Sequence, residues 1–147
     1  MLLWLLLTVL TWAQPDVAGR VIDLINDQRA AMGLPALTTS PELDEAAQSY
    51  SQVLASMDCF DHTCGPVSDL GDRLAQSGYT DWQAIGENIA AGYGTPDAVV
   101  GGWMSSPAHR SNILSAQYAD VGIGMATGGQ YGTYWTADFG ARQGDGE

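Results

Sequence analysis

The chain has 147 residues, enough for one domain with a sizeable core, so any disulfide would act only as a local brace. It carries 17 acidic residues against five basic ones, all arginine, and its net charge is −12. Such a charge repels phosphate backbones and anionic lipid surfaces, so we expect no nucleic acid among its partners.

Residues 1–13 have the pattern of a secretory signal peptide. An apolar run extends from Leu2 to Leu10, and small residues follow as far as Ala13, as they do before a cleavage site. The run is about half the ~20 residues that a membrane-spanning helix needs. We therefore expect a mature protein that begins near Gln14, is secreted or lies in the periplasm or cell envelope, and has no stable membrane span.

Two helices are predicted in the first part of the mature chain. Apolar residues recur at helical spacing from a first turn at Pro15 to Met32, and Gly33 follows. A second amphipathic pattern begins at the N-cap Ser40 and continues to Ser56. The linker between these patterns is short, so both helices should pack on one core.

Shorter elements are predicted in the rest of the chain. They are a helix capped by Ser68 that ends near Ser77, a strand and turn at 84–92, a helix beginning at Thr95, a helical turn from Pro107 to Ile113, and a hairpin of strands 121–127 and 133–140. Helices interleaved with short strands indicate an α+β or α/β/α layered domain. We find no internal repeat or second domain, and residues 142–147 have the composition of a disordered tail.

The segment CFDHTC, residues 59–64, contains both cysteines and one of the two histidines. A zinc site built from cysteine pairs would need a second pair of thiols. A catalytic thiol is disfavoured because two neighbouring cysteines in an exported chain normally oxidise. We therefore predict a disulfide between Cys59 and Cys64, whose short loop fixes the direction of His62.

Three polar residues are candidates for chemistry. His62 lies in the cysteine loop, His109 lies at the start of a short helix, and Glu87 lies in a mostly apolar stretch, where a carboxylate needs a partner. Imidazole and carboxylate groups suit zinc or another divalent ion, or a general acid and base pair. No short ligand motif joins the three residues, so local sequence leaves open whether they form a site or are structural.

Five ordered blocks resemble the bacterial branch of the CAP superfamily, the cysteine-rich secretory, antigen 5 and pathogenesis-related proteins, also called SCP-like extracellular proteins. The blocks are His62 with its neighbouring cysteine, GENIA at 86–90, WMSSPAHRSNIL at 103–114, YADVGIGMA at 118–126 and YWTADFG at 134–140; residues 21–55 resemble the family's first two helices. The resemblance implies a CAP-type three-layer α-β-α sandwich, with a small and mostly antiparallel sheet, over residues 14–141.

In this family a His-Glu-Glu-His set lines a solvent-accessible cleft and binds zinc or another divalent cation in some members. The resemblance implies that His62, Glu87 and His109 occupy three of these positions, while Ser106 stands where the remaining glutamate is expected. All four are thus candidates for the ligand-binding cleft. His62, His109 and Glu87 are the candidates for metal binding and, if there is any catalysis, for catalysis. Because a serine lacks the charge of a carboxylate, a bound metal would keep open positions.

Three functions remain open at this point. The first is a secreted, non-enzymatic, monomeric module whose cleft binds a small molecule, a lipid or a divalent ion, or which contacts another envelope or extracellular protein. The second is a metal-assisted hydrolase, peptidase-like or esterase-like, in which Glu87 takes a proton from a metal-bound water. The third is a structural or adhesive envelope protein. The sequence shows no oxyanion-hole motif or nucleophile elbow, which favours the first.

Overall fold

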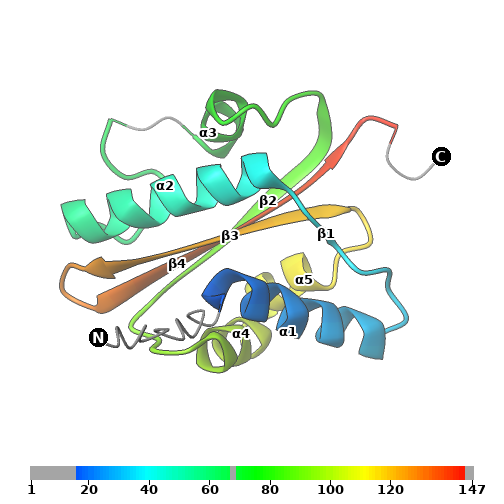
Figure 1. Cartoon of the computed structure of the whole chain (residues 1–147), viewed down its shortest axis with the longest axis horizontal. Coiled ribbons are helices and arrows are strands. Elements are labelled where there is room, and N and C mark those ends of the chain that lie inside the picture. Colours follow the sequence, from blue (N-terminus) through cyan, green and yellow to red (C-terminus); the bar gives the residue numbers. More distant parts are fainter. Residues whose placement is uncertain (1–15, 67–68, 145–147) are drawn as a thin grey trace, which may run out of the picture.

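The computed structural model describes residues 16–66 and 69–144. Within them the helices are α1 (Val17–Ala31), α2 (Pro41–Met57), α3 (Leu70–Gln76), α4 (Pro96–Met104) and α5 (Pro107–Ile113), and the strands are β1 (Thr38–Thr39), β2 (Trp82–Ala91), β3 (Asp120–Gly128) and β4 (Gly132–Arg142). Figure 1 shows α2 and α3 on one face of the sheet, and α1, α4 and α5 on the other. The predicted three-layer α-β-α sandwich is therefore confirmed.

The sheet is mixed but mostly antiparallel. Its strand order is β1-β3-β4-β2, in which β1 is parallel to β3 and the other pairs are antiparallel. The predicted C-terminal hairpin is present as β3 and β4, which pair as far as Gly128 and Gly132. The sequence did not predict β1, because two residues are too few to show a strand period. Strand β2, which carries Glu87, lies at one edge of the sheet.

The helix starts follow from capping residues. Ser40 caps α2 as predicted, and Thr95, where a helix was predicted to begin, caps α4. Each side chain accepts a hydrogen bond from the backbone N–H three residues later, at 3.2 and 3.1 Å. The N-cap of α3 is Asp69, whose carboxylate accepts from the N–H of Asp72 at 3.0 Å. Ser68, the predicted cap, lies outside the described residues, as do the predicted signal peptide and residues 145–147.

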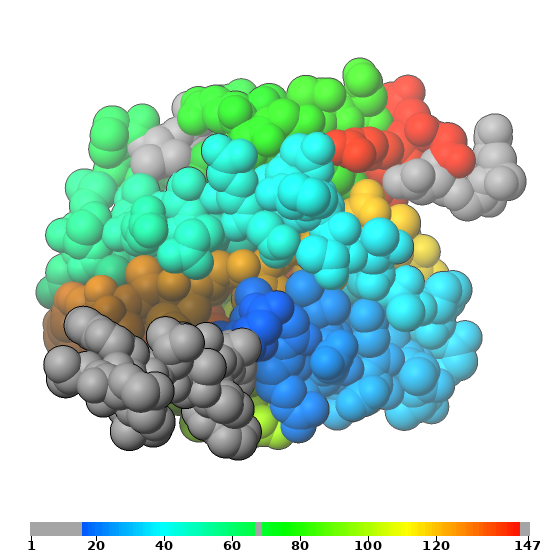
Figure 2. All heavy atoms as spheres, viewed as in Figure 1, coloured from blue at the N-terminus to red at the C-terminus, as the bar shows by residue number. Residues whose placement is uncertain are grey.

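The two faces of β3 differ because small and large residues alternate along it. On the face toward α1, the buried Val121 and Ile123 belong to the main apolar core. On the other face, an added Cβ at Gly122 would lie 2.1 Å from the backbone of Leu43, and one at Gly124 would lie 2.4 Å from the backbone of Ala47. The backbone of α2 therefore packs directly on β3. In Figure 2 the atoms of α2 and α1 cover the sheet on opposite sides.

The predicted disulfide between Cys59 and Cys64 is present. At the other end of the chain, Arg142 was expected to begin the tail but is the last residue of β4, and the N–H of Gln143 donates to Asp81 O at 2.8 Å. No helix in the described part of the chain is long and apolar enough to cross a membrane.

Candidate functional site

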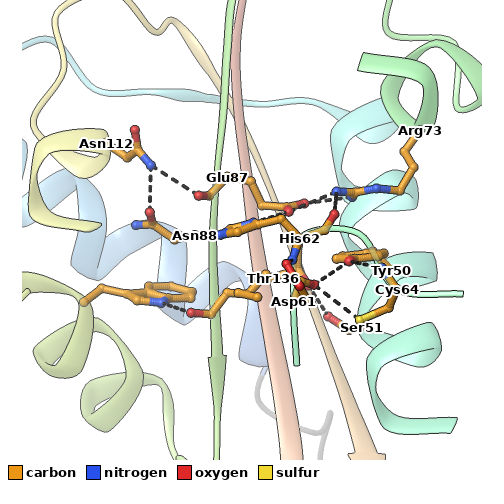
Figure 3. A network of polar contacts seen from close by, with 12 residues as sticks. Tyr50, Ser51, Asp61, His62, Cys64, Arg73, Glu87, Asn88, Asn112 and Thr136 are labelled. Carbon is orange, nitrogen blue, oxygen red and sulfur yellow. Dashed lines mark hydrogen bonds and ion pairs between the residues drawn. The ribbon is translucent and has the colours of Figure 1, made fainter. Parts of the chain in front are cut away.

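Glu87 lies on β2 and directs its side chain toward α2 and α3, where only 2% of it is exposed. Arg73 donates to both carboxylate oxygens, from Nη1 to Oε2 at 2.8 Å and from Nη2 to Oε1 at 3.0 Å. His62 Nδ1 lies 2.8 Å from Oε1. Figure 3 shows Arg73 and His62 converging on this carboxylate. The structure thus brings two of the predicted site residues, His62 and Glu87, into direct contact.

Arg73 was not predicted to belong to the site. It comes from α3, its guanidinium lies 3.6 Å above the centre of the Tyr50 ring, and its Nη2 also donates to His62 O at 3.2 Å. The side chain is 4% exposed, so its charge depends on Glu87 for compensation. The sequence feature that could have drawn attention to Arg73 is the scarcity of basic residues, because only five occur in the whole chain.

Asp138 is a second residue that the sequence analysis missed. It lies on β4 directly opposite Glu87 in the strand register and is fully buried. No donor among the described residues bonds to either of its carboxyl oxygens. Burial first, and then the nearby charge of Glu87, raise the pKa of Asp138 well above its usual range. Both effects favour the protonated form of Asp138. The sequence feature that could have indicated Asp138 is its position as an acidic residue within the apolar segment YWTADFG.

The pKa shifts of Glu87 and His62 both favour the ionised forms of these side chains. Burial alone would raise the pKa of Glu87, but the hydrogen bonds from His62 and Arg73 outweigh it and lower the pKa to about 2. The same bond to Glu87 raises the pKa of His62, against the opposing effect of burial. Because Glu87 is ionised, we assign the hydrogen of the shared bond to His62 Nδ1, so Nε2 is the nitrogen left for other partners.

Contacts of the disulfide loop hold His62 in position. Tyr50 Oη donates to Asp61 O at 2.5 Å and accepts from the N–H of Cys64 at 3.1 Å, which ties the loop to α2. The N–H of His62 donates to Asp61 Oδ1 at 2.6 Å. The His62 ring is nevertheless 53% exposed, so it is held in one direction while still accessible to solvent.

His109 approaches from the other side of β2, on α5. The Asn88 side chain donates to His109 O at 3.0 Å, and Asn112 Nδ2 donates to Glu87 O at 3.2 Å and to Asn88 Oδ1 at 2.9 Å. In Figure 3, Asn112 and Arg73 lie on opposite sides of β2. Burial, and then the positive charge of His62, lower the pKa of His109. His109 is thus close enough to His62 for the two charges to interact.

A cavity of about 280 Å³ lies beside His109. It is lined by Phe60, Ile89, Ala90, Ala91, Tyr93, Gly102, Trp103, Ser106 and His109. Two of the four predicted cleft residues, Ser106 and His109, thus share one cavity, while Glu87 is buried behind the strand with Arg73. Trp103 is 1% exposed and donates from Nε1 to Ile89 O at 3.0 Å.

These contacts restrict the chemistry that Glu87 can perform. The guanidinium of Arg73 lies where a cation bound by this carboxylate would be repelled, so the arrangement disfavours Glu87 as a metal ligand. A carboxylate with a pKa of about 2 is also a weak general base near neutral pH. Among the described residues, no three or more His, Cys, Asp or Glu side chains are grouped so that they could hold a metal ion. Zinc binding, predicted for His62, His109 and Glu87, stays a prediction.

Comparison with known proteins gives consistent matches. The model of the cysteine-rich secretory protein family, CAP, matches residues 22–139. The Bacillus subtilis (strain 168) protein "Uncharacterized protein YkwD" is 33% identical over 120 residues, which are 82% of this chain and 45% of that protein. The chain therefore spans less than half the length of this relative.

Two solved structures have a similar fold. An extracellular protein containing an SCP domain from Bacillus anthracis gives a TM-score of 0.77 at 29% identity, over 85% of this chain and 40% of that one. An outer surface protein of Borrelia burgdorferi gives a TM-score of 0.75 at 20% identity, over 84% of this chain and 90% of that one. The second likeness concerns the fold alone.

Proposed function

Because the chain belongs to the cysteine-rich secretory protein family, CAP, we propose that it is a secreted, non-enzymatic module whose cleft binds a small extracellular ligand. One observation carries the proposal: a cavity of about 280 Å³ lies beside β2 and is lined by two of the predicted cleft residues, Ser106 and His109. Concave sites with a mostly apolar lining and a few convergent polar groups are typical of small-ligand binding.

Secretion is supported by independent features. The apolar pattern of residues 1–13 is that of a signal peptide. The disulfide between Cys59 and Cys64 suits an oxidising compartment. The Bacillus anthracis neighbour is described as an extracellular protein.

Binding is favoured over catalysis by the state of Glu87. Both of its oxygens accept from Arg73, one is also in contact with His62, and its pKa of about 2 makes it a weak base near neutral pH. The metal-assisted hydrolase needed this carboxylate as its base. Zinc binding is a narrower proposal that now rests on the two imidazoles of His62 and His109, with the remaining positions open.

The binding proposal is tested by recording ¹⁵N NMR spectra of the mature domain with a library of small compounds that each contain a polar and an apolar group. We expect amide shifts at residues 89–91 and 102–109, and their loss in His109→Ala. Arg110→Ala is the matched control, because this neighbouring side chain is exposed and does not line the cavity. A library that shifts no amide around the cavity would contradict the proposal.

The zinc proposal has a separate test. Isothermal titration with zinc is compared for the wild-type domain, His62→Ala and His109→Ala. A zinc site held by the two imidazoles gives heat only in the wild type. Equal heats in all three proteins would reject it.

A further inference from the structure

Exposed aromatic rings gather at the cavity beside β2. Five large apolar side chains are exposed among the described residues, and three of them are aromatic: Phe60 at 49%, Tyr93 at 36% and Tyr131 at 53%. Phe60 and Tyr93 line the cavity, and the Tyr131 ring lies 6.4 Å from that of Phe60. Apolar surface that stays in water and is grouped around a concave site marks a place where another molecule binds.

The rings that line the cavity come from three parts of the fold. Phe60 belongs to the disulfide loop, residues 59–64. Tyr93 follows β2, and its carbonyl oxygen accepts a hydrogen bond from Trp135 Nε1 at 2.8 Å, which ties this residue to β4. Trp103 lines the cavity from α4 and is itself buried. Three rings from separate elements thus border one hollow.

The position of the Tyr93 ring depends on a glycine of α4. An added Cβ at Gly102 would lie 2.4 Å from Tyr93 Oη and 2.5 Å from Tyr93 Cζ, which is too close for both groups to keep their places. An added Cβ at the neighbouring Gly101 would meet no described atom within 4 Å. The missing side chain at Gly102 therefore allows the Tyr93 ring to lie against α4 at the cavity.

The charges around the cavity favour a cation over an anion. None of its described lining residues is Arg, Lys, Asp or Glu, and His109 is the only one that can carry a positive charge. Within two positions of the lining residues, the chain carries Asp58, Asp61, Glu87, His62 and Arg110. Even with His62 protonated and with Arg73 counted against Glu87, these neighbours have no net positive charge. The chain as a whole has a net charge of −12, so its field attracts cations and repels anions.

A quaternary ammonium group fits this lining better than a primary ammonium group. A primary ammonium has three N–H donors, and burying them without acceptors costs free energy. The carbonyl of Ile89, a lining residue, already accepts from Trp103 Nε1 at 3.0 Å. A quaternary ammonium has no N–H, and the faces of aromatic rings within about 6 Å attract its charge. The volume of about 280 Å³ is near the lower end of the usual ~300–1,000 Å³ for ligand pockets, which suits one such head group.

We propose that the ligand of this cleft carries a quaternary ammonium group, which lies among the rings of Phe60, Tyr93 and Trp103. This inference rests on the proposed function and adds the chemical class of the ligand. A soluble quaternary amine and the choline head group of a phospholipid offer the same chemistry, so the experiment includes both sources.

The first probes are choline and its neutral isostere 3,3-dimethylbutan-1-ol, titrated into the ¹⁵N-labelled mature domain. The titrations are made at pH 7.5, where His109, with a pKa below 6.5, is uncharged. We expect choline to shift the amide signals of residues 89–91 and 102–103 and to bind about tenfold more tightly than the alcohol, because only choline is attracted by the ring faces. Equal affinities would overturn the inference and leave the proposed function intact, since the cavity would still bind a small ligand. If neither probe binds, the inference is overturned, and the compound library decides on the proposed function separately.

The source of the ammonium group is assigned by sedimentation with phosphatidylcholine vesicles. Co-sedimentation of the domain that free choline abolishes assigns the lipid head group. Binding of choline without co-sedimentation assigns a soluble amine. Co-sedimentation that persists in saturating choline would place the vesicle contact outside this cavity and overturn the lipid source.

Two glycines of α4 provide a matched pair of variants. Gly102→Ala places a methyl group where the Tyr93 ring lies, whereas Gly101→Ala adds the same group in open space. Both changes favour the helical backbone to the same extent. We expect Gly102→Ala to weaken choline binding about fivefold or more and Gly101→Ala to leave it unchanged. Equal choline affinity in the two variants would remove the Tyr93 ring from the site.

Tyr93→Leu tests the ring without crowding α4, and it decides the matter if Gly102→Ala fails to fold. Leucine keeps an apolar side chain at the cavity but has no aromatic face. We expect the variant to bind choline about fivefold or more weakly and to bind 3,3-dimethylbutan-1-ol as the wild type does. An equal loss for both probes would show that Tyr93 supplies only apolar contact, and would overturn the recognition of a cation.

Discussion

The two faces of the sheet bury their side chains in different ways. On the face toward α1, α4 and α5, the buried cluster is apolar and includes Ile25, Trp103 and Phe139. On the face toward α2 and α3, the sheet buries Glu87 and Asp138 in addition to two smaller apolar clusters. One arginine from α3 compensates this charge. Apolar burial stabilises a fold roughly in proportion to the area removed from water.

The buried ion pair on the face toward α2 and α3 contributes to stability in a different way. A buried ion pair contributes little net stability relative to a well-packed apolar replacement, because both ions lose their hydration. This pair instead sets the orientation of a side chain. The bidentate contact with Arg73 fixes the Glu87 carboxylate, which in turn bonds to Nδ1 of His62. Apolar clusters on both faces hold the domain together, and we infer that the ion pair on the α2 and α3 face positions the cleft histidine.

The largest expected effect comes from breaking the ion pair on one side. Glu87→Gln leaves the Arg73 charge buried without a counter-ion, so we expect a loss of about 3–5 kcal/mol in the free energy of unfolding, measured with urea. Replacing both partners, Arg73→Met with Glu87→Leu, should restore most of this stability. A double variant as unstable as Glu87→Gln would show that the pair itself stabilises the fold, and would contradict the distinction between the two faces.

Most of the fold could be predicted from the sequence because its signals are local. The N-caps Ser40 and Thr95 and the apolar stripes of the helices are read within a few residues. The alternation of glycine with larger residues in β3 likewise predicts a strand. By contrast, the two-residue β1 exists only because it pairs with β3, so no periodicity could reveal it.

The site was predictable only in part, because some of its contacts are made between residues far apart in the sequence. The resemblance pointed to His62, Glu87, Ser106 and His109, but it did not indicate Arg73 or Asp138. Arg73 reaches Glu87 from a separate helix 14 residues earlier in the chain. Asp138 meets Glu87 only through the register of β2 and β4. Partners of this kind are set by tertiary packing, and the sequence signal is limited to a charged residue within an apolar segment.

Removing the disulfide should have the next largest effect. Cys59→Ser with Cys64→Ser opens a short loop, and the entropy of its closure corresponds to about 2 kcal/mol of unfolding free energy. Because the loop carries His62, we expect the Nδ1 contact with Glu87 to become disordered as well, which NMR of the imidazole nitrogens can follow. A His62 signal that is unchanged by this double substitution would show that Glu87 alone positions the ring.

A smaller effect is expected from a conservative change on the apolar face. Ile25→Val removes one buried methylene and should cost about 1 kcal/mol, equally at pH 7 and pH 3, because no titrating group is involved. The cost of Glu87→Gln should instead be smaller at pH 3. The folded-state pKa of Glu87, about 2, lies below its unfolded value of 4.5, so its contribution is present above pH 4.5 and is lost as the pH falls toward 2. Urea unfolding at both pH values compares the two faces directly, and equal pH dependence of both variants would contradict the assignment of an ionised Glu87.

The smallest effect on stability, and the most direct test of the positioning role, is the titration of the two histidines. We expect the pKa of His62 to lie above 6.5, because its bond to Glu87 favours the charged ring, and the pKa of His109 to lie below 6.5, because burial opposes its charge. The raised pKa means that His62 contributes stability below pH 6.5 and loses this contribution as the pH rises through its folded-state pKa. In Glu87→Gln the pKa of His62 should fall toward 6.5, while that of His109 should change only through the reduced charge of its neighbour. NMR titration of the imidazole signals in both proteins measures each value, and a His62 pKa that is the same with and without Glu87 would mean that the ion pair does not control the ring that faces the cleft.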